Sequence, residues 1–241
     1  MGLEQKREWV ETRFGEVKEE VLGELKEVKE IFWPDLKKEY LIKGRTLKYE
    51  MIELDKYADR VAEIYRKAID EMIGNSEYEW HHDPEEIVKH YDTGDWNFYG
   101  CFLNDELIGV ESMFIIRGQR SIQWVWGCVD PDYRGYGVWQ NIGLFNDELL
   151  SLSNTQMGIV WVATTHPYSQ MTAESAGYKP IGCFVGGEFL GGSDSKYYRQ
   201  NVIWYSKLYG EGNIFKQSMD DMKLTDSARK LVESVKELWS N

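Results

Sequence analysis

A glycine-containing segment between a predicted strand and a predicted helix carries residue types suited to binding phosphate. It runs from Val129 to Trp139 with the sequence VDPDYRGYGVW. Gly135 and Gly137 allow the backbone to turn tightly and to direct several amide hydrogens into one concavity. A helix N-terminus after this turn adds roughly half a positive charge, and Arg134 adds a guanidinium able to pair with phosphate oxygens. The segment therefore predicts a pyrophosphate-binding loop.

Two other phosphate-binding motifs fit this segment poorly. A dinucleotide fingerprint requires a third glycine where the chain has Gln140, and a P-loop requires a Lys followed by Ser or Thr, which is missing here. The strands before the segment also have an antiparallel pattern, unlike those of a doubly wound sheet. NAD and ATP are therefore disfavoured as ligands.

Alternation of apolar and polar residues predicts a mainly antiparallel sheet around this loop. The run 158–163 (GIVWVA) is continuously apolar, which is typical of a strand buried on both faces. The other strands are expected at 45–51, 97–103, 107–116, 121–129, 179–185 and 197–206. The stretch GGEFLGGSDS between the last two is expected to be a loop.

Apolar residues three and four apart predict the helices. The expected ranges are 10–32 with an end at Pro34, 35–41, 58–72 with a cap at Gly74, 84–91, 138–152, 167–176, and 228–239 with an N-cap at Thr225. A length of 241 residues suits one α/β domain with appended helices. We therefore expect a helical extension over 1–44, a central domain over 45–208 and an amphipathic helical end over 209–241.

Composition limits the partners and the compartment. The chain has 41 acidic and 28 basic residues, a net charge of -13, which opposes binding to nucleic acid or to anionic membranes. The same acidity suits a cationic amine substrate, although solubility explains it as well. Three scattered cysteines indicate a reducing compartment. No signal peptide or long apolar run is evident, so a cytoplasmic protein is expected, with a homodimer left open.

The loop and the elements around it resemble the GNAT superfamily of acyl-coenzyme A dependent N-acyltransferases. The family signature is Gln or Arg, two residues, Gly, one residue, then Gly or Ala, and Arg134 and Gly137 match it. The stretch 158–184 looks like the family's fifth strand, fourth helix and following Gly-aromatic turn, here Gly177 and Tyr178. The resemblance covers about residues 45–206. It implies an α/β fold with a mixed, mostly antiparallel sheet flanked by helices.

The resemblance further implies the transfer of an acetyl or other acyl group from acyl-coenzyme A to an amine, by direct attack. The acceptor is expected to be a small-molecule or protein amine. Two strands ending near Val129 and Ala163 are expected to splay apart around the pantetheine arm, with backbone amides near Cys128 and Val129 polarising the thioester. The resemblance assigns cofactor binding to Cys128, Val129, Arg134, Gly135, Tyr136, Gly137, Val138 and Trp139. A non-catalytic acyl-coenzyme A binding or regulatory module stays open, as does an interaction platform without coenzyme A affinity.

Three positions depart from the family pattern. Trp139 stands where the family has Gly or Ala, so either the pyrophosphate sits less deeply or the indole packs aside against the core. His166 stands at a position often held by Asn, and Ala173 at the position of the frequent tyrosine general acid. The usual proton donor is therefore missing from its usual place.

Proton transfer must then come from other side chains, since the reaction needs a base and a donor for the leaving thiolate. The predicted catalytic residues are His166, Tyr168 and Ser169, which follow the buried strand near the expected thioester end. A helix-start histidine and a packed tyrosine are the structural alternatives. Glu111 is a further base candidate, for which an exposed strand carboxylate is the favoured interpretation.

Other reactive residue types receive structural interpretations. Cys128 is expected to be a small buried thiol, because no His is fixed near it to make it a nucleophile. His82, Glu86 and His90 could share a helix face, but Asp83-Pro84 is typical of a helix start and no HExxH or cysteine motif supports a metal. No metal is expected.

Four tryptophans leave two interpretations open. They could form an aromatic pocket for the acceptor or simply belong to the core, which is common for large aromatic residues in strands. The residues are Trp80, Trp96, Trp124 and Trp126.

Overall fold

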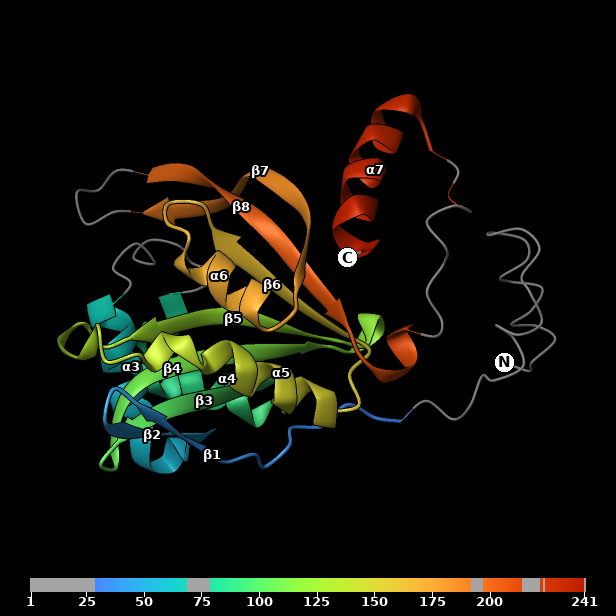
Figure 1. Ribbon diagram of the computed structural model, residues 1–241. Helices are drawn as coiled ribbons and strands as arrows, with labels where there is room; N and C mark the ends of the chain where they lie inside the picture. Colours follow the sequence, from blue (N-terminus) through green and yellow to red (C-terminus); the bar gives the residue numbers. More distant parts are fainter. Residues whose placement is uncertain (1–28, 69–78, 192–196, 214–221, 223, 241) are drawn as a thin grey trace. The chain divides into compact units, whose positions relative to one another are not determined.

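The computed structural model describes residues 29–68, 79–191, 197–213, 222 and 224–240. The chain divides into two compact units, 1–30 and 31–241. All helices and strands below belong to the second unit (Figure 1). None of the helices in the described part of the chain is both long and apolar enough to cross a membrane.

Eight strands form one sheet in the order β1-β2-β3-β4-β5-β6-β8-β7. Neighbouring strands are antiparallel except β5 and β6, which are parallel. The strands are β1 (Lys38–Ile42), β2 (Arg45–Met51), β3 (Trp96–Leu103), β4 (Glu106–Ile116), β5 (Ser121–Val129), β6 (Met157–Ala163), β7 (Lys179–Gly191) and β8 (Tyr197–Leu208).

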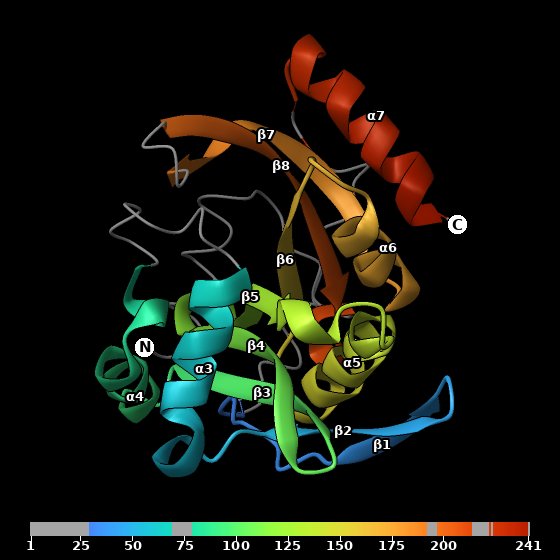
Figure 2. The same ribbon diagram turned by 90° about the vertical axis from the view of Figure 1, so that its left-hand side faces the viewer.

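Helices cover both faces of this sheet. Figure 2 shows α3 and α4 on one side of β3 to β5, and α5 and α6 on the other. A fifth helix, α7, follows β8 and contacts β7. The helices are α3 (Leu54–Ala68), α4 (Pro84–Asp92), α5 (Ile142–Leu152), α6 (Tyr168–Ser175) and α7 (Asp226–Ser240).

Each helix layer encloses its own core. Under α3 and α4 the fully buried residues include Val61, Ile87 and Phe98. Under α5 and α6 they include Tyr99 and Phe145. Burying a side chain of this size is worth about 1.5–3 kcal/mol, so the apolar spacing read from the sequence explains which helix faces the sheet.

Local signals set several element ends. Asp83 caps α4 by accepting a hydrogen bond from the Glu85 amide at 2.9 Å. Thr225 caps α7 by accepting from the Ala228 amide at 3.3 Å. Asn104 and Asp105 take left-handed backbone angles between β3 and β4, as a tight hairpin turn requires. These predicted features, and the predicted fold class, are confirmed.

Two predicted assignments are wrong. The helix expected over 35–41 is absent, and Lys38–Ile42 is instead an edge strand paired with β2. Lys43 and Gly44 have positive φ values of 50° and 76°, which closes a two-residue hairpin. Part of the loop expected after Val185 is also strand, because β7 runs to Gly191. Cross-strand hydrogen bonding to β8 sustains it despite the glycines.

Three further predictions concern helix ends. Most of the helix expected over 10–32 lies outside the described residues, and the described residues from Lys29 on are not helical there. The cap at Gly74 also lies outside them. The helix expected from residue 138 begins instead at Ile142, after a short 3-10 turn over Val138–Gln140.

Candidate active site

The parallel strands β5 and β6 separate part of the way along the sheet. Their pairing runs from Ser121↔Met157 to Trp124↔Val160 and ends there. Beyond it, β5 continues to Val129 and β6 to Ala163. This diverging region is called the strand gap below. In Figure 1 the ribbons of β5 and β6 start close together and diverge along their length.

A β-bulge on β5 lies where the pairing with β6 ends. On its other side β5 pairs with β4 at Met113↔Trp124 and at Glu111↔Gly127. Ser112 alone therefore faces two residues of β5, Val125 and Trp126. An extra residue of this kind bends its strand and increases the local twist, which accounts for the divergence of β5 from β6.

Buried side chains hold the bulge from the α3 side. The Ser112 hydroxyl accepts a hydrogen bond from the Trp126 amide at 3.2 Å and lies 3.3 Å from the Trp126 carbonyl. Tyr65 donates to the same carbonyl at 2.9 Å. His81 Nε2 lies 3.1 Å from the Ser112 hydroxyl. Tyr65, His81 and Ser112 are fully buried, and paired polar groups at such depth fix a single geometry.

The loop after β5 starts with an anchored turn. Asp130 accepts from the Asp132 amide at 3.0 Å and forms an ion pair with Arg60 at 2.6 Å. Burial pushes the pKa of Asp130 upward, but these hydrogen bonds and the nearby charge of Arg60 outweigh it and hold the pKa below its usual value. The end of β5 is thereby tied to α3, which carries Arg60.

The predicted phosphate loop has the expected backbone. Gly135 and Gly137 have φ values of 83° and 89°, in the left-handed region that favours glycine. Between them, Tyr136 packs under the Arg45 guanidinium, 4.3 Å from the ring centre. The Lys43 ammonium donates to the Gly135 carbonyl at 2.9 Å. Sequence reasoning missed both basic residues.

Val138 and Trp139 anchor the far end of the loop. Val138 is buried, and its carbonyl accepts from the Tyr49 hydroxyl at 2.5 Å. The Trp139 indole packs against the core and lies over Gly127, where an added Cβ would overlap it. Of the two interpretations of Trp139, the structure therefore has the indole packed aside against the core.

Glu111 lies beside the same glycine. Its carboxylate would also overlap a Cβ on Gly127, so it covers β5 beyond the last pair with β6. The residue is 3% exposed, and its Oε2 has no hydrogen-bond partner among the described residues. Burial raises the pKa of Glu111 to about 8. The expectation of an exposed strand carboxylate is wrong, because Trp139 closes over this position.

Cys128 lies on the opposite face of β5. It belongs to the core under α3 and α4 and is 7% exposed. Burial and the nearby Glu111 carboxylate raise its pKa well above the usual value, against an opposing effect of Arg134. The thiol therefore stays protonated, and the expected small buried sulfur is confirmed.

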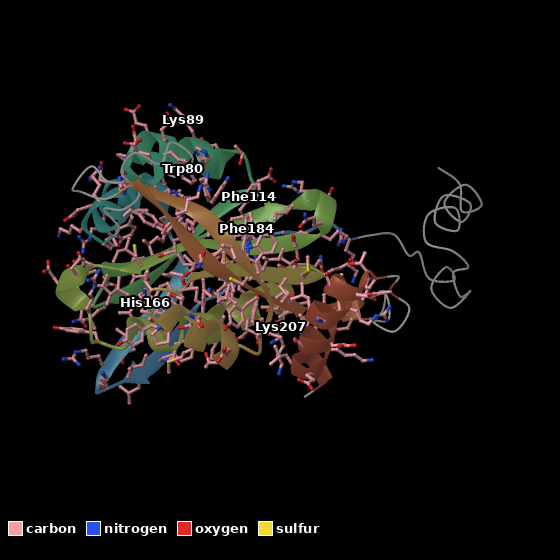
Figure 3. All side chains as sticks on the ribbon, turned by 90° about the horizontal axis from the view of Figure 1, so that it is seen from above. Trp80, Lys89, Phe114, His166, Phe184 and Lys207 are labelled. Carbon is pink, nitrogen blue, oxygen red and sulfur yellow. The ribbon has the colours of Figure 1, made fainter. Side chains whose placement is uncertain are left out.

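The predicted catalytic residues lie after the end of β6. His166 and Tyr168 are exposed, with ring centres 5.4 Å apart, and Ser169 is half-buried. In Figure 3 His166 is well separated from Trp80 and Lys89 near α4. Ala173 is completely buried in the core, so a tyrosine could not be accommodated there without repacking. The roles of His166, Tyr168 and Ser169 stay predictions.

The aromatic and histidine residues near α4 form a packed cluster. The Trp80 ring stacks on the rings of His81 and His90, each with centres 3.7 Å apart. Trp96 meets Trp80 edge to face at 4.9 Å. In the described part of the chain no three His, Cys, Asp or Glu side chains converge as a metal site would require.

The other two tryptophans lie on opposite faces of β5. Trp126 packs against the core under α3 and α4, together with Trp80 and Trp96. Trp124 is buried in the core under α5 and α6. The four tryptophans expected as a pocket or as core therefore do not share one face of the sheet.

No protein-family model matches the sequence, and no curated protein matches it. Solved structures match the fold. The ribosomal-protein-S5-alanine acetyltransferase from Vibrio fischeri aligns with a TM-score of 0.56 at 13% identity, over 76% of this chain and 100% of that one. RimL, a ribosomal L7/L12 alpha-N-protein acetyltransferase in complex with coenzyme A, aligns at 0.53 and 14%, over 71% and 98%. The spermidine/spermine N-acetyltransferase SpeG from Vibrio cholerae aligns at 0.51 and 18%, over 67% and 92%.

Proposed function

We propose that this chain, which has the GNAT acetyltransferase fold, is an N-acyltransferase that moves an acetyl or other acyl group from acyl-coenzyme A to an amine. The main observation that supports this proposal is the strand gap between β5 and β6. It lies beside the loop in which Gly135 and Gly137 have left-handed backbone angles. Strands that diverge leave backbone hydrogen-bonding groups for a ligand. A glycine-rich turn beside such a gap suits a pyrophosphate joined to a pantetheine arm.

The charges around the loop fit a polyphosphate ligand. The chain as a whole carries a net charge of -13, yet Lys43, Arg45 and Arg134 gather at this loop. Lys43 and Arg45 contact its backbone and Tyr136, while Arg134 is exposed. Guanidinium and ammonium groups attract phosphate oxygens, and amide hydrogens add directed donors. A RimL structure with coenzyme A supports an acyl-coenzyme A donor.

The bound donor would supply a thioester carbonyl for attack by a neutral amine. In this proposal the backbone at Cys128 and Val129 polarises that carbonyl, and the bulge held by Ser112 sets the direction of this backbone. Glu111 takes the amine proton, because its carboxylate covers the gap side of Gly127 and its pKa is raised toward the working range of a base. His166 or Tyr168, with Ser169 beside them, returns a proton to the departing thiolate.

The test is release of free thiol from acetyl-coenzyme A with a panel of amines. Arg134→Ala and Lys43→Ala are each expected to raise KM for acetyl-coenzyme A about tenfold, since each loses a charged contact to phosphate. Arg117→Ala is the matched control, because Arg117 is exposed and pairs only with Asp95 among the described contacts. If all three variants have the same KM for acetyl-coenzyme A, the loop is not part of the cofactor site.

A second function has specific support in Ala173 and Trp139. The buried alanine lacks the family's proton donor, and the indole occupies space beside Gly127. Both suit a module that binds acyl-coenzyme A without turnover. That function predicts a thermal shift with acetyl-coenzyme A and no thiol release with any amine.

A further inference from the structure

An aromatic array lies on the part of the sheet beyond the strand gap. The rings of Trp161 on β6 and Trp204 on β8 are stacked, with centres 4.9 Å apart and planes at 10°. Phe184 on β7 meets Trp204 edge to face at 6.0 Å. Trp161 pairs with Trp204 across the strands, so all three rings share one face. We call these residues the aromatic wall.

The wall lies on the face away from α5 and α6. Val160 and Val162 of β6 belong to the core under those helices, and side chains alternate along a strand. Trp161 therefore projects to the other face. Both tryptophans are only partly buried, and Phe184 is 50% exposed.

The position of Trp161 in β6 places it at the strand gap. Trp161 is the first residue of β6 after the last pair, Trp124↔Val160. Trp204 stacks on one face of its indole. We call the face that Trp204 does not cover the outer face of Trp161.

The far end of the wall is closed by β7. An added Cβ on Gly187 would lie 2.6 Å from the Phe184 ring, so the missing side chain lets the ring rest on the strand. Glu188 follows, and it accepts a hydrogen bond from Gln200 at 2.9 Å. This carboxylate is engaged and lies beyond Phe184, away from the gap. Glu188 is therefore not a counter-ion for a molecule that contacts the outer face of Trp161.

Resting on the proposed function, we propose that the outer face of Trp161 binds the body of the acceptor, and that the acceptor is an amine carried by a flat aromatic group. A planar ring placed there would continue the Trp204 and Trp161 stack, the arrangement in which aromatic rings gain most from contact. Its amine, on a short linker, would then enter the strand gap, which Glu111 borders from the opposite face. Trp161 determines specificity in this arrangement and takes no part in proton transfer.

The experiment compares 2-phenylethylamine, 2-cyclohexylethylamine and spermidine as acceptors with wild type, Trp161→Leu and Trp161→Phe. Wild type is expected to favour the phenyl over the cyclohexyl amine in kcat/KM. Trp161→Leu should raise KM for the phenyl amine about tenfold while kcat and the KM for acetyl-coenzyme A stay constant, and Trp161→Phe should recover most of the loss. Trp33→Phe is the matched control, because Trp33 packs near Tyr99 of β3 and donates a hydrogen bond to the Gly94 carbonyl.

Binding of the amines alone, measured by calorimetry, separates this inference from the proposed function. Weaker phenyl-amine binding by Trp161→Leu than by wild type supports the inference even without thiol release. Two results would overturn the inference but not the proposed function. One is a higher kcat/KM for spermidine than for 2-phenylethylamine. The other is a ratio of kcat/KM between the phenyl and cyclohexyl amines that is the same in Trp161→Leu and in wild type. Absence of thiol release with every amine overturns the proposed function alone.

Discussion

Replacing Glu111 with glutamine should change how stability depends on pH. Burial raises the pKa of Glu111 from 4.5 to about 8, so the folded state binds this proton more tightly than the unfolded chain. The contribution of Glu111 to the free energy of unfolding is therefore greatest below about pH 4.5. It falls as the pH rises toward 8 and stays constant above that pH. Glutamine at this position does not titrate, so Glu111→Gln should lack this loss.

The size of the effect follows from the two pKa values. A tenfold change in a protonation equilibrium is worth about 1.4 kcal/mol, so the interval from 4.5 to about 8 corresponds to about 5 kcal/mol at most. Solvent entering beside Trp139 would reduce this figure. The free energy of unfolding of Glu111→Gln relative to wild type should thus rise by several kcal/mol between pH 5 and about pH 8.

Urea unfolding of both proteins at each pH measures this difference, and groups that titrate equally in both cancel. Glu39→Gln, which changes an exposed carboxylate on β1, is the control and should show a constant difference. If the difference in unfolding free energy between Glu111→Gln and wild type changes by less than about 1 kcal/mol between pH 5 and about pH 8, the Glu111 carboxylate ionises normally. The burial argument and the assignment of Glu111 as the base would then both fail.

The pH dependence of activity tests the same assignment. If Glu111 is the base, wild-type kcat/KM should rise with pH up to about 8.

Three further substitutions test other parts of the site. Ser112→Ala removes the hydroxyl that hydrogen-bonds to the Trp126 backbone and should lower the free energy of unfolding by about 1–3 kcal/mol. It should also lower kcat while the KM for acetyl-coenzyme A stays nearly constant. An unchanged kcat would mean that the bulge has no part in catalysis. Gly137→Ala forces a side chain into a left-handed position, so thermal unfolding should show a loss of about 1–2 kcal/mol and acetyl-coenzyme A binding should weaken. Gly127→Ala should displace Trp139 and Glu111, which tryptophan fluorescence detects, whereas Gly118→Ala has open space around it and should alter neither stability nor fluorescence.

Periodicity in the sequence was sufficient to predict most of the central fold. The meander β3 to β5, the strand β6 and the helices α4 and α6 follow from apolar spacing and turn residues, because each element buries a face that its own pattern defines. Only the burial of β6 was overestimated, since Trp161 on one of its faces is half-buried. The edge strand β1 was mistaken for a helix because its five residues (KEYLI) are too few to show a strand alternation, and the Lys43-Gly44 hairpin that pairs it with β2 was not recognised. The extension of β7 was missed because its glycines were interpreted as loop residues, although this part of the strand pairs with β8.

The site was predictable where a local motif defines it. Gly135 and Gly137 were identified because a left-handed turn requires glycine in a short stretch of sequence. Lys43 lies 92 residues before Gly135, which it contacts, and Arg45 is similarly far from Tyr136, so no local pattern links them to the loop. Glu111 was misjudged for a related reason, since only the tertiary position of Trp139 decides whether that strand face meets solvent.

The β1–β2 hairpin supplies two of the three cations at the proposed phosphate loop. Lys43 and Arg45 reach Gly135 and Tyr136 from the edge of the sheet, while the loop itself contributes only Arg134 as a cation. If the proposed function holds, substitutions on this hairpin should change the affinity for coenzyme A and its salt dependence without disturbing the strand gap. Hydrogen exchange at the Lys43-Gly44 turn should then slow when the adjoining loop binds its ligand.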